Sequence, residues 1–333
     1  MSMTSTFAVV DLFAGPGGLA EGFSSVRNTD GTRPFQIELS VEKEATAFQT
    51  LRLRSFLRNF PSGFPDEYYQ FLNGEIPEPN WSERFPAEWA RACNETRQLE
   101  LGTPAAQEEI DKRLDEITST YRSNVVLIGG PPCQAYSLVG RARNMGIAGY
   151  KASEAHRHFL YKEYIRIVEK LQPAVFVMEN VKGILSSAVE GERVFDRVLH
   201  DLAEVGNGAY QLVPLSPRSK DVMLLPGAHP PATDFIVRSE DHSVPQARHR
   251  VIVVGVRKDI LHEKPLPVLA ALQLPKSESV VTVRDILQPI PRLRSGFSDR
   301  DDAPDVWQHD VARLMRDVSR LDPGLDREKR TEF

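Results

Sequence analysis

Residues 7–18 read Phe-Ala-Val-Val-Asp-Leu-Phe-Ala-Gly-Pro-Gly-Gly. The first seven residues are mostly apolar and include β-branched side chains, which is typical of a buried strand. After the glycine-rich turn, Leu19, Phe23 and Val26 recur at helical spacing on one face. A strand, a glycine turn and a helix in this order begin a nucleotide-binding βαβ unit. The opening of the chain therefore predicts an α/β domain.

The glycine turn and the acidic residue after the next strand fit a nucleotide site. Residues 15–20 follow the form G-x-G-x-x-G/A, in which glycines let the backbone approach a ligand closely. Residues 35–41 alternate between apolar and polar side chains, and Glu42 ends this predicted strand. A carboxylate there can accept both hydroxyls of a ribose. These features predict a nucleoside-containing cofactor, with a purely structural turn as the alternative.

A second apolar run leads to a cysteine. Residues 125–134 read Val-Val-Leu-Ile-Gly-Gly-Pro-Pro-Cys-Gln, a short buried strand that ends at two glycines and two prolines. Cys133 therefore follows the carboxyl end of a strand, the edge where open α/β sheets bind their ligands. A lone thiol in such a place is most often a small buried side chain, so its neighbours decide between a structural and a chemical role.

Two further strand ends carry ionisable side chains. Glu179 ends the predicted strand 175–178 beside Asn180, where a carboxyl group could donate a proton or cap the next helix. Arg248 and Arg250 are two residues apart at the start of another predicted strand, so they share a face. Two guanidinium groups on one face could bind phosphates, a base edge or a carboxylate, although a solvent-facing pair is the commoner case.

The loop after Cys133 is basic and contains several glycines. Residues 135–151 include Arg141, Arg143 and Lys151. Such a loop could close over an anionic substrate, and a solvated loop is an equally good interpretation.

The composition restricts the class of protein. The chain has 333 residues, a net charge of -5 and two cysteines, which predicts a cytoplasmic protein without a disulfide framework. No apolar run approaches the roughly 20 residues of a membrane span. No Cys/His cluster has zinc-ligand spacing, so we expect no metal. Because the net charge is negative, binding to nucleic acid would require a local basic surface.

Taken together, four motifs in this order resemble those of the DNA (cytosine-5) methyltransferases of restriction-modification systems. The resemblance covers roughly residues 7–257 and rests on these segments: residues 11–18, 130–134, 179–181 and 246–250. It implies a Rossmann-like methyltransferase fold, mostly parallel with one reversed strand and with helices on both faces of the sheet. It also implies S-adenosylmethionine as the cofactor, S-adenosylhomocysteine as the product, and double-stranded DNA of the bacterial nucleoid as the partner.

The resemblance assigns cofactor contacts to seven residues: Phe13, Pro16, Gly18, Glu42, Lys43, Pro132 and Leu160. Glu42 would hold the ribose. Lys43 stands where the family often has tryptophan, so packing against the adenine must differ. For the acidic residue near the adenine amino group, Glu75 and Glu116 are both candidates.

The resemblance also implies a covalent mechanism on a cytosine flipped out of the duplex. Cys133 would add to C6 of the base, Glu179 would donate a proton to N3, Arg250 would hold O2, and Arg248 would steady the site. Residues assigned to the substrate and the DNA are Gln134, Ser137, Arg141, Arg143, Asn180, Val181 and Gln246.

The expected domain organisation departs from the family. We expect a catalytic domain over residues 1–257, with an aromatic-rich insertion over about 61–104 that packs on it. Residues 258–333 would be a linker and the start of a target recognition region. This region is short and contains no Gly-Asn-Ser or Gly-Asn-Ala. The sequence is therefore consistent with three alternatives: a truncated enzyme, one half of a split enzyme whose target recognition comes from a C-terminal segment or a second chain, or a member that has lost DNA targeting.

Three other functions compete with this interpretation. A transfer-RNA cytosine-5 methyltransferase would usually carry a Cys-Phe-Thr element, which is absent. A non-catalytic DNA-binding or partner-stimulating homologue would typically lose Cys133 or Glu179. A nicotinamide oxidoreductase would rest on the first glycine turn alone and would bind NAD.

Overall fold

A computed structural model describes residues 6–132, 160–189, 191–216, 230–263, 271–290, 296 and 302–321. The chain divides into two compact units, residues 1–281 and 282–333. The first unit contains the sheet and all of the motifs above. The assignment of residues 1–257 to catalysis and of residues 258–333 to a linker and a recognition region stays a prediction.

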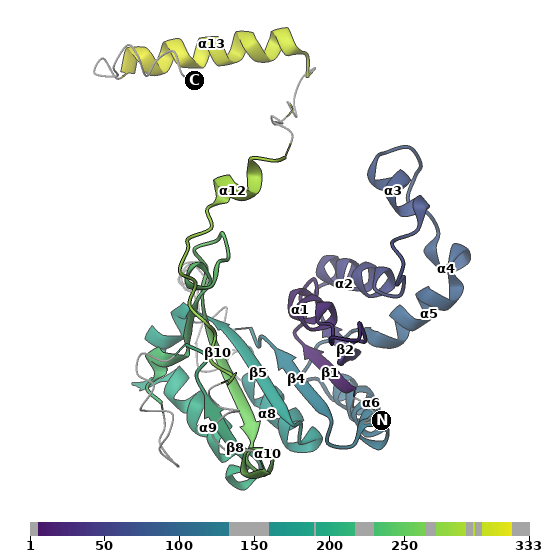
Figure 1. Ribbon diagram of the computed structural model, residues 1–333, viewed down its shortest axis with the longest axis vertical. Coiled ribbons are helices and arrows are strands. Elements are labelled where there is room, and N and C mark those ends of the chain that lie inside the picture. Colours follow the sequence, from purple (N-terminus) through teal and green to yellow (C-terminus); the bar gives the residue numbers. More distant parts are fainter. Residues whose placement is uncertain are drawn as a thin grey trace. The chain divides into compact units, whose positions relative to one another are not determined.

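The centre of the first unit is an eight-stranded sheet with the order β3-β2-β1-β4-β5-β10-β8, and β9 pairs with β10 (Figure 1). Its strands are β1 (Phe7–Leu12), β2 (Phe35–Glu42), β3 (Thr96–Gln98), β4 (Val125–Gly129), β5 (Val175–Val181), β8 (Tyr210–Val213), β9 (Ile236–Arg238) and β10 (His249–Arg257). A separate two-stranded sheet pairs β6 (Ala188–Val189) with β7 (Glu192–Arg193).

Strand directions confirm the predicted sheet. The pairs β3·β2, β2·β1, β1·β4 and β4·β5 are parallel. Strand β10 is antiparallel to β5, β8 and β9, so it is the one reversed strand among those described. All five residues of β4 are buried, as expected for a central parallel strand that is covered on both faces.

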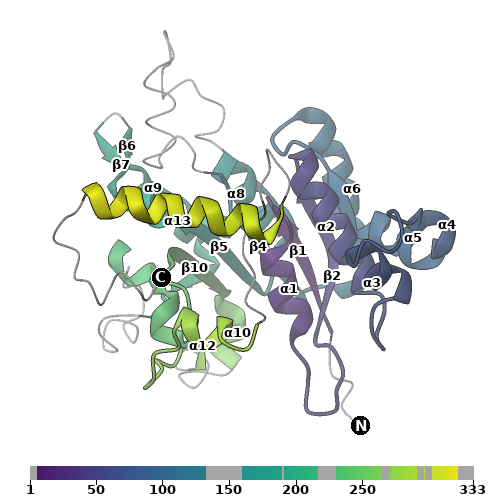
Figure 2. The ribbon, with the colours of Figure 1, turned by 90° about the horizontal axis from the view of Figure 1, so that it is seen from above.

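Helices cover both faces of this sheet, which also confirms the prediction (Figure 2). Side chains of α6, α8 and α9 form the larger core cluster with β1, β4 and β5 on one face, and α1 packs on Val9, Ile37 and Val126 on the other. In the described part of the first unit, the helices are α1 (Gly18–Ser25), α2 (Ala45–Leu57), α3 (Asp66–Leu72), α4 (Trp81–Arg84), α5 (Pro86–Glu95), α6 (Pro104–Tyr121), α8 (Leu160–Leu171), α9 (Val194–Gly208) and α10 (Lys258–Glu263). Short 3₁₀ helices are η3 (Lys182–Ser186), η5 (Ala232–Phe235) and η6 (Ser239–His242).

The second unit contains α12 (Val283–Leu287) and α13 (Pro304–Leu321). Helix α12 begins with a capping box, in which Thr282 accepts from the Asp285 N–H and Asp285 accepts from the Thr282 N–H. Within the described ranges, no helix combines the length and the apolar character that a bilayer crossing requires.

The aromatic stretch after α2 is ordered around Phe56. Helices α3, α4 and α5 supply rings to a cluster in which Phe56 lies 5.3 Å from Trp81 and 5.6 Å from Trp89, centroid to centroid. Strand β3, which the sequence analysis does not predict, follows α5 directly and extends the sheet beside β2. The stretch 61–104 therefore contributes an edge strand to the sheet as well as packed helices.

Gly255 is a position in the sheet with no room for a side chain. A Cβ there would lie 2.1 Å from the ring of Phe176, the buried residue that pairs with Gly255 across β5 and β10. We expect Gly255→Ala to lower the free energy of unfolding by about 3 kcal/mol, because the ring must leave its place in the core. Urea unfolding measures this loss.

Gly22 provides the matched control for this substitution. It lies in α1 and is exposed, and a Cβ added there would have no other atom within 4 Å. Gly22→Ala should leave stability unchanged or raise it by up to about 1 kcal/mol through helix propensity. Equal urea midpoints for the Gly255→Ala protein and the unsubstituted protein would contradict the steric argument.

Candidate active site

The carboxyl ends of β1, β2 and β4 surround a cavity of about 410 Å³. Its lining residues are Phe13, Val41, Glu42, Lys43, Glu44, Leu99, Glu100, Leu101, Gly130, Pro132 and Leu160. Five of the seven predicted cofactor residues are in this set, whereas Pro16 lies in the adjoining glycine turn and Gly18 begins α1. Parallel strands end at the same edge, which is why segments far apart in the sequence meet here.

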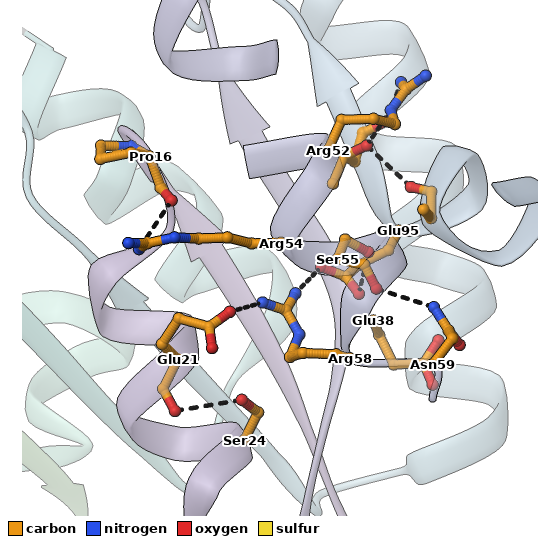
Figure 3. A network of polar contacts seen from close by, with 12 residues as sticks. Pro16, Glu21, Ser24, Glu38, Arg52, Arg54, Ser55, Arg58, Asn59 and Glu95 are labelled. Atoms are coloured by element: carbon orange, nitrogen blue, oxygen red, sulfur yellow. Dashed lines mark hydrogen bonds and ion pairs between the residues drawn. The ribbon is translucent and has the colours of Figure 1, made fainter. Parts of the chain in front are cut away.

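The glycine turn has the backbone that its sequence requires. Gly15 and Gly17 have φ of 56° and 89°, in the left-handed region where glycine carries no steric penalty. At Gly17 a Cβ would also lie 2.9 Å from Leu51 Cδ1, because α2 packs directly against the turn. From the same helix, Arg54 donates a hydrogen bond to the Pro16 carbonyl at 3.2 Å (Figure 3). Helix α2 therefore holds the turn in place.

Glu42 is oriented by two backbone groups. Its Oε2 accepts from the Gly15 N–H at 2.8 Å, and its Oε1 accepts from the Glu44 N–H at 2.7 Å. A carboxylate has about four acceptor positions, so both oxygens can accept further hydrogen bonds. The carboxylate is fixed beside the cavity in a form that suits the two hydroxyls of a ribose.

Glu100 is a cavity residue that the sequence analysis missed. The segment Leu99–Leu101 follows β3, and the Leu99 N–H donates to the Glu42 carbonyl at 3.1 Å. The two acidic residues named from the sequence are elsewhere. Glu75 accepts from Asn73 in the loop after α3, and Glu116 pairs with Arg113 on α6. Strand β3 is short and polar, so no local sequence signal points to Glu100.

The apolar walls and the carboxylates of the cavity fit a nucleoside. Phe13, Leu99 and Leu160 supply apolar surface, and Glu42 and Glu100 supply acceptors for hydroxyl and amino groups. The volume lies within the range of about 300–1,000 Å³ that is usual for small-molecule sites. Among the described residues, no group of three or more His, Cys, Asp or Glu side chains could hold a metal ion.

Glu179 and Arg250 form an ion pair beside the cavity. Arg250 Nε lies 2.8 Å from Glu179 Oε1, across the antiparallel pair β5·β10. Glu179 lies inside β5, which continues to Val181, and not at the end of the strand as the sequence predicts. Gly130 lines the cavity, and a Cβ added to it would lie 3.1 Å from Glu179 Oε2, so the glutamate lies directly beside this glycine.

Asn180 connects the same strand to the loop before Cys133. Its buried Nδ2 donates to the Pro131 carbonyl at 3.1 Å, and its Oδ1 accepts from the Val181 N–H at 2.8 Å. Arg248 and Gln246 precede β10 and are exposed. Five residues predicted for the reaction or the DNA lie outside the described residues: Cys133, Gln134, Ser137, Arg141 and Arg143.

A charged network joins the helices that pack near the glycine turn (Figure 3). Arg58, directly after α2, forms ion pairs with Glu21 on α1 and Glu95 on α5, and Ser55 donates to Glu95 at 2.7 Å. Only 11% of the side-chain surface of Arg58 and of Glu95 is exposed. The network joins three helices around the glycine turn.

Asp11 is the buried acid of β1, immediately before this turn. Complete burial, together with the negative charge of Glu95, raises its pKa from 3.8 to about 8. Between these two values the folded protein keeps a proton that the unfolded chain releases, so stability falls as the pH rises. Above about pH 8 both states are ionised and the fall ends.

We expect Asp11→Asn to remove this pH dependence. Between pH 5 and 7.5, the free energy of unfolding of the unsubstituted protein should fall relative to that of the variant by roughly 1 kcal/mol per pH unit. Urea unfolding at several pH values measures both slopes. The control is Asp30→Asn, because Asp30 is exposed and hydrogen bonds from Thr32 lower its pKa, so it does not titrate in this window. Parallel profiles for Asp11→Asn and the unsubstituted protein would show that Asp11 is ionised in the fold.

Comparison with known proteins assigns the chain to a family. The profile of the C-5 cytosine-specific DNA methylases matches residues 84–302. The chain is 30% identical over 302 residues to Type II methyltransferase M.Bpa9945I of Bacillus paralicheniformis, covering 86% of this chain and 61% of that protein. It is 25% identical over 256 residues to the DNA-cytosine methyltransferase of Escherichia coli K12, covering 76% of this chain and 43% of that protein.

A solved structure, a DNA modification methyltransferase encoded within an E. coli prophage, aligns with a TM-score of 0.49 and 20% identity over 93% of this chain and 69% of that one. The chain spans about three fifths of the length of M.Bpa9945I and less than half of the E. coli enzyme. The family profile covers well over half of the chain and supports the resemblance seen in its motifs. The chain therefore belongs to the C-5 cytosine-specific DNA methylases, a family that takes its methyl group from S-adenosylmethionine, as the sequence predicts.

Proposed function

We propose that this protein methylates C5 of cytosine in double-stranded DNA, as a DNA (cytosine-5) methyltransferase of the bacterial restriction-modification kind. The observation that carries the proposal is the position of Gly130, which lines the nucleoside-sized cavity and also lies directly beside Glu179. A methyl donor in the cavity and a base at Glu179 would then be neighbours. Direct transfer of a methyl group from the donor to the base requires that the two lie next to each other.

Different cavity residues would bind different parts of the cofactor. Glu42 would hold the ribose hydroxyls, and Glu100 would accept from the adenine amino group. Phe13, Leu160 and Pro132 would contact the adenine ring and the methionine chain of the cofactor. Helix α1 begins at Gly18, and the free N–H groups of its first turn would face the methionine part. Bound S-adenosylmethionine supplies a methyl group on a positively charged sulfur.

The protein's own residues would activate the cytosine. Its C5 is a poor nucleophile, and addition of the Cys133 thiolate to C6 converts C4–C5 into an enamine that can accept the methyl group. Glu179 gives a proton to N3, so that negative charge does not accumulate on the ring. Loss of the C5 proton to solvent, breaking of the carbon–sulfur bond and return of the N3 proton to the Glu179 carboxylate then restore the neutral aromatic base and the free thiolate.

The two arginines would hold the base electrostatically. Arg250 is paired with Glu179 and donates from Nη1 to the His249 carbonyl at 2.8 Å. A guanidinium has five N–H donors, so others would be available for O2 of the cytosine. Arg248 would add positive charge from the residues before β10. The cytosine must leave the duplex to reach these groups, and the basic residues Arg141 and Arg143 would hold its phosphates.

Asn180 and its neighbours would position the nucleophile and the DNA. Asn180 anchors the Pro131 carbonyl, two residues before Cys133, to strand β5. Val181 and Gln246 would contact the substrate side, together with Gln134 and Ser137. Recognition of the DNA sequence is assigned to residues outside 1–257 or to a second chain in the same bacterial cytoplasm.

Transfer of labelled methyl groups tests this function. The protein is incubated with labelled S-adenosylmethionine and either DNA or RNA, with and without a candidate C-terminal partner, and bisulfite mapping locates the product. Label at C5 of cytosines in double-stranded DNA is the expected result. Label in RNA alone would favour a transfer-RNA methyltransferase, and cofactor binding without any transfer would favour a non-catalytic homologue.

A further inference from the structure

An ion pair forms part of the cavity wall. Lys43 Nζ lies 2.6 Å from Glu100 Oε1, and both residues line the cavity. Lys43 directly follows β2 and Glu42, whereas Glu100 follows β3, so the two strands that pair at the edge of the sheet each supply one charge. Hydrogen bonds from the Leu99 N–H to the Glu42 carbonyl, and from the Gln98 side chain to the Lys43 carbonyl, hold the two segments together.

Stability alone does not account for this pair. The side chains of Lys43 and Glu100 are 58% and 46% exposed, and ion pairs with that exposure typically contribute about 0–1 kcal/mol. Removing the charge of Lys43 should therefore leave the fold intact. The pair does place a strong hydrogen-bond donor directly beside a strong acceptor, on a wall that is otherwise apolar at Leu99 and Leu101.

This donor–acceptor order matches one edge of adenine. The adenine ring presents an acceptor, N1, next to a donor, the N6 amino group. Hypoxanthine presents the reverse order at these two positions, an N1–H donor next to the O6 acceptor. A lysine ammonium has three donors, so Lys43 can keep its contact with Glu100 and still donate to a ligand.

We propose that Lys43 donates to N1 of the cofactor's adenine while Glu100 accepts from N6, so that the ion pair selects adenine over other bases. The proposal rests on the proposed function, because it requires the cavity to hold the nucleoside of S-adenosylmethionine. It assigns to Lys43 a recognition role through a charged hydrogen bond, in the place where an aromatic side chain would only stack. Glu42 would then bind the ribose, and the next residue, Lys43, would bind the base.

Calorimetric binding of cofactor analogues tests the proposal without relying on turnover. The unsubstituted protein should bind S-adenosylhomocysteine at least about tenfold more tightly than its 1-deaza analogue, which lacks N1, and than S-inosylhomocysteine. Lys43→Met should bind S-adenosylhomocysteine about tenfold more weakly and should no longer discriminate against the 1-deaza analogue. Glu100→Gln should weaken binding of the N6-bearing ligands and should keep the 1-deaza penalty.

Lys170→Met is the matched control. Lys170 forms an ion pair of 2.7 Å with Asp115, between α8 and α6, and does not line the cavity. Its removal should change none of these affinities. A 1-deaza penalty that persists in Lys43→Met would overturn the assignment of Lys43. Failure of the unsubstituted protein to bind S-adenosylhomocysteine at all would instead count against the proposed function.

Discussion

Cys133→Ser is expected to abolish covalent trapping of this protein on DNA that contains 5-fluorocytosine. The fluorine at C5 cannot leave as a proton does, so a base that has bonded to the nucleophile and received a methyl group stays attached. A serine hydroxyl remains protonated near neutral pH and does not add to C6, whereas a thiol ionises readily. Methyl transfer to ordinary DNA should fall by a factor on the order of 10³ or more.

Denaturing gel electrophoresis with labelled DNA measures the trapped complex. Cys93→Ser is the control, because Cys93 is the other cysteine of the chain. It accepts a hydrogen bond from Arg52 at 3.1 Å and does not line the cavity. The control should trap DNA as the unsubstituted protein does. If the Cys133→Ser protein still formed the complex, another side chain would be the nucleophile.

Glu179→Gln is expected to lower kcat by roughly 10²–10³-fold, because an amide of the same shape cannot transfer a proton to N3. Binding of S-adenosylmethionine should stay within about a factor of two, since Glu179 lies beside Gly130 but does not itself line the cavity. Single-turnover kinetics and calorimetry measure the two quantities separately.

The control for this substitution is Glu163→Gln on α8. Glu163 also forms an ion pair with an arginine, Arg166, at 2.9 Å, and it is not a cavity residue. The control should keep its kcat. Normal turnover in the Glu179→Gln protein would remove Glu179 from the proton-donor role, and loss of cofactor binding would show a structural role instead.

The strands that carry the motifs can be read from the sequence because each has a strong local signal. Strands β1, β4 and β5 each contain an apolar run followed by glycine, proline or charged residues, and this pattern depends only on neighbouring residues. Strand β3 has no such signal. Its three residues, Thr96–Gln98, are mostly polar and follow directly after α5, so only its pairing with β2 defines it.

The missed strand explains the missed site residue. Glu75 and Glu116 are reasonable candidates from their local sequence, but a position beside the cavity depends on which strand a residue follows. Because β3 pairs with β2, Glu100 lies next to Lys43, 57 residues earlier in the chain. No local pattern marks that contact, which exists only once the edge of the sheet has formed.

Motifs and periodicity are properties of short segments, so the sequence alone predicts the family, the strands that carry the motifs and the kinds of chemistry available. Which of these groups meet depends on the tertiary structure. It joins Glu179 to Arg250 across β5·β10, brings Gly130 against both Glu179 and the cavity, and pairs Lys43 with Glu100. The physical reason is that such contacts depend on strand order and register, which are set by packing between segments distant in the sequence.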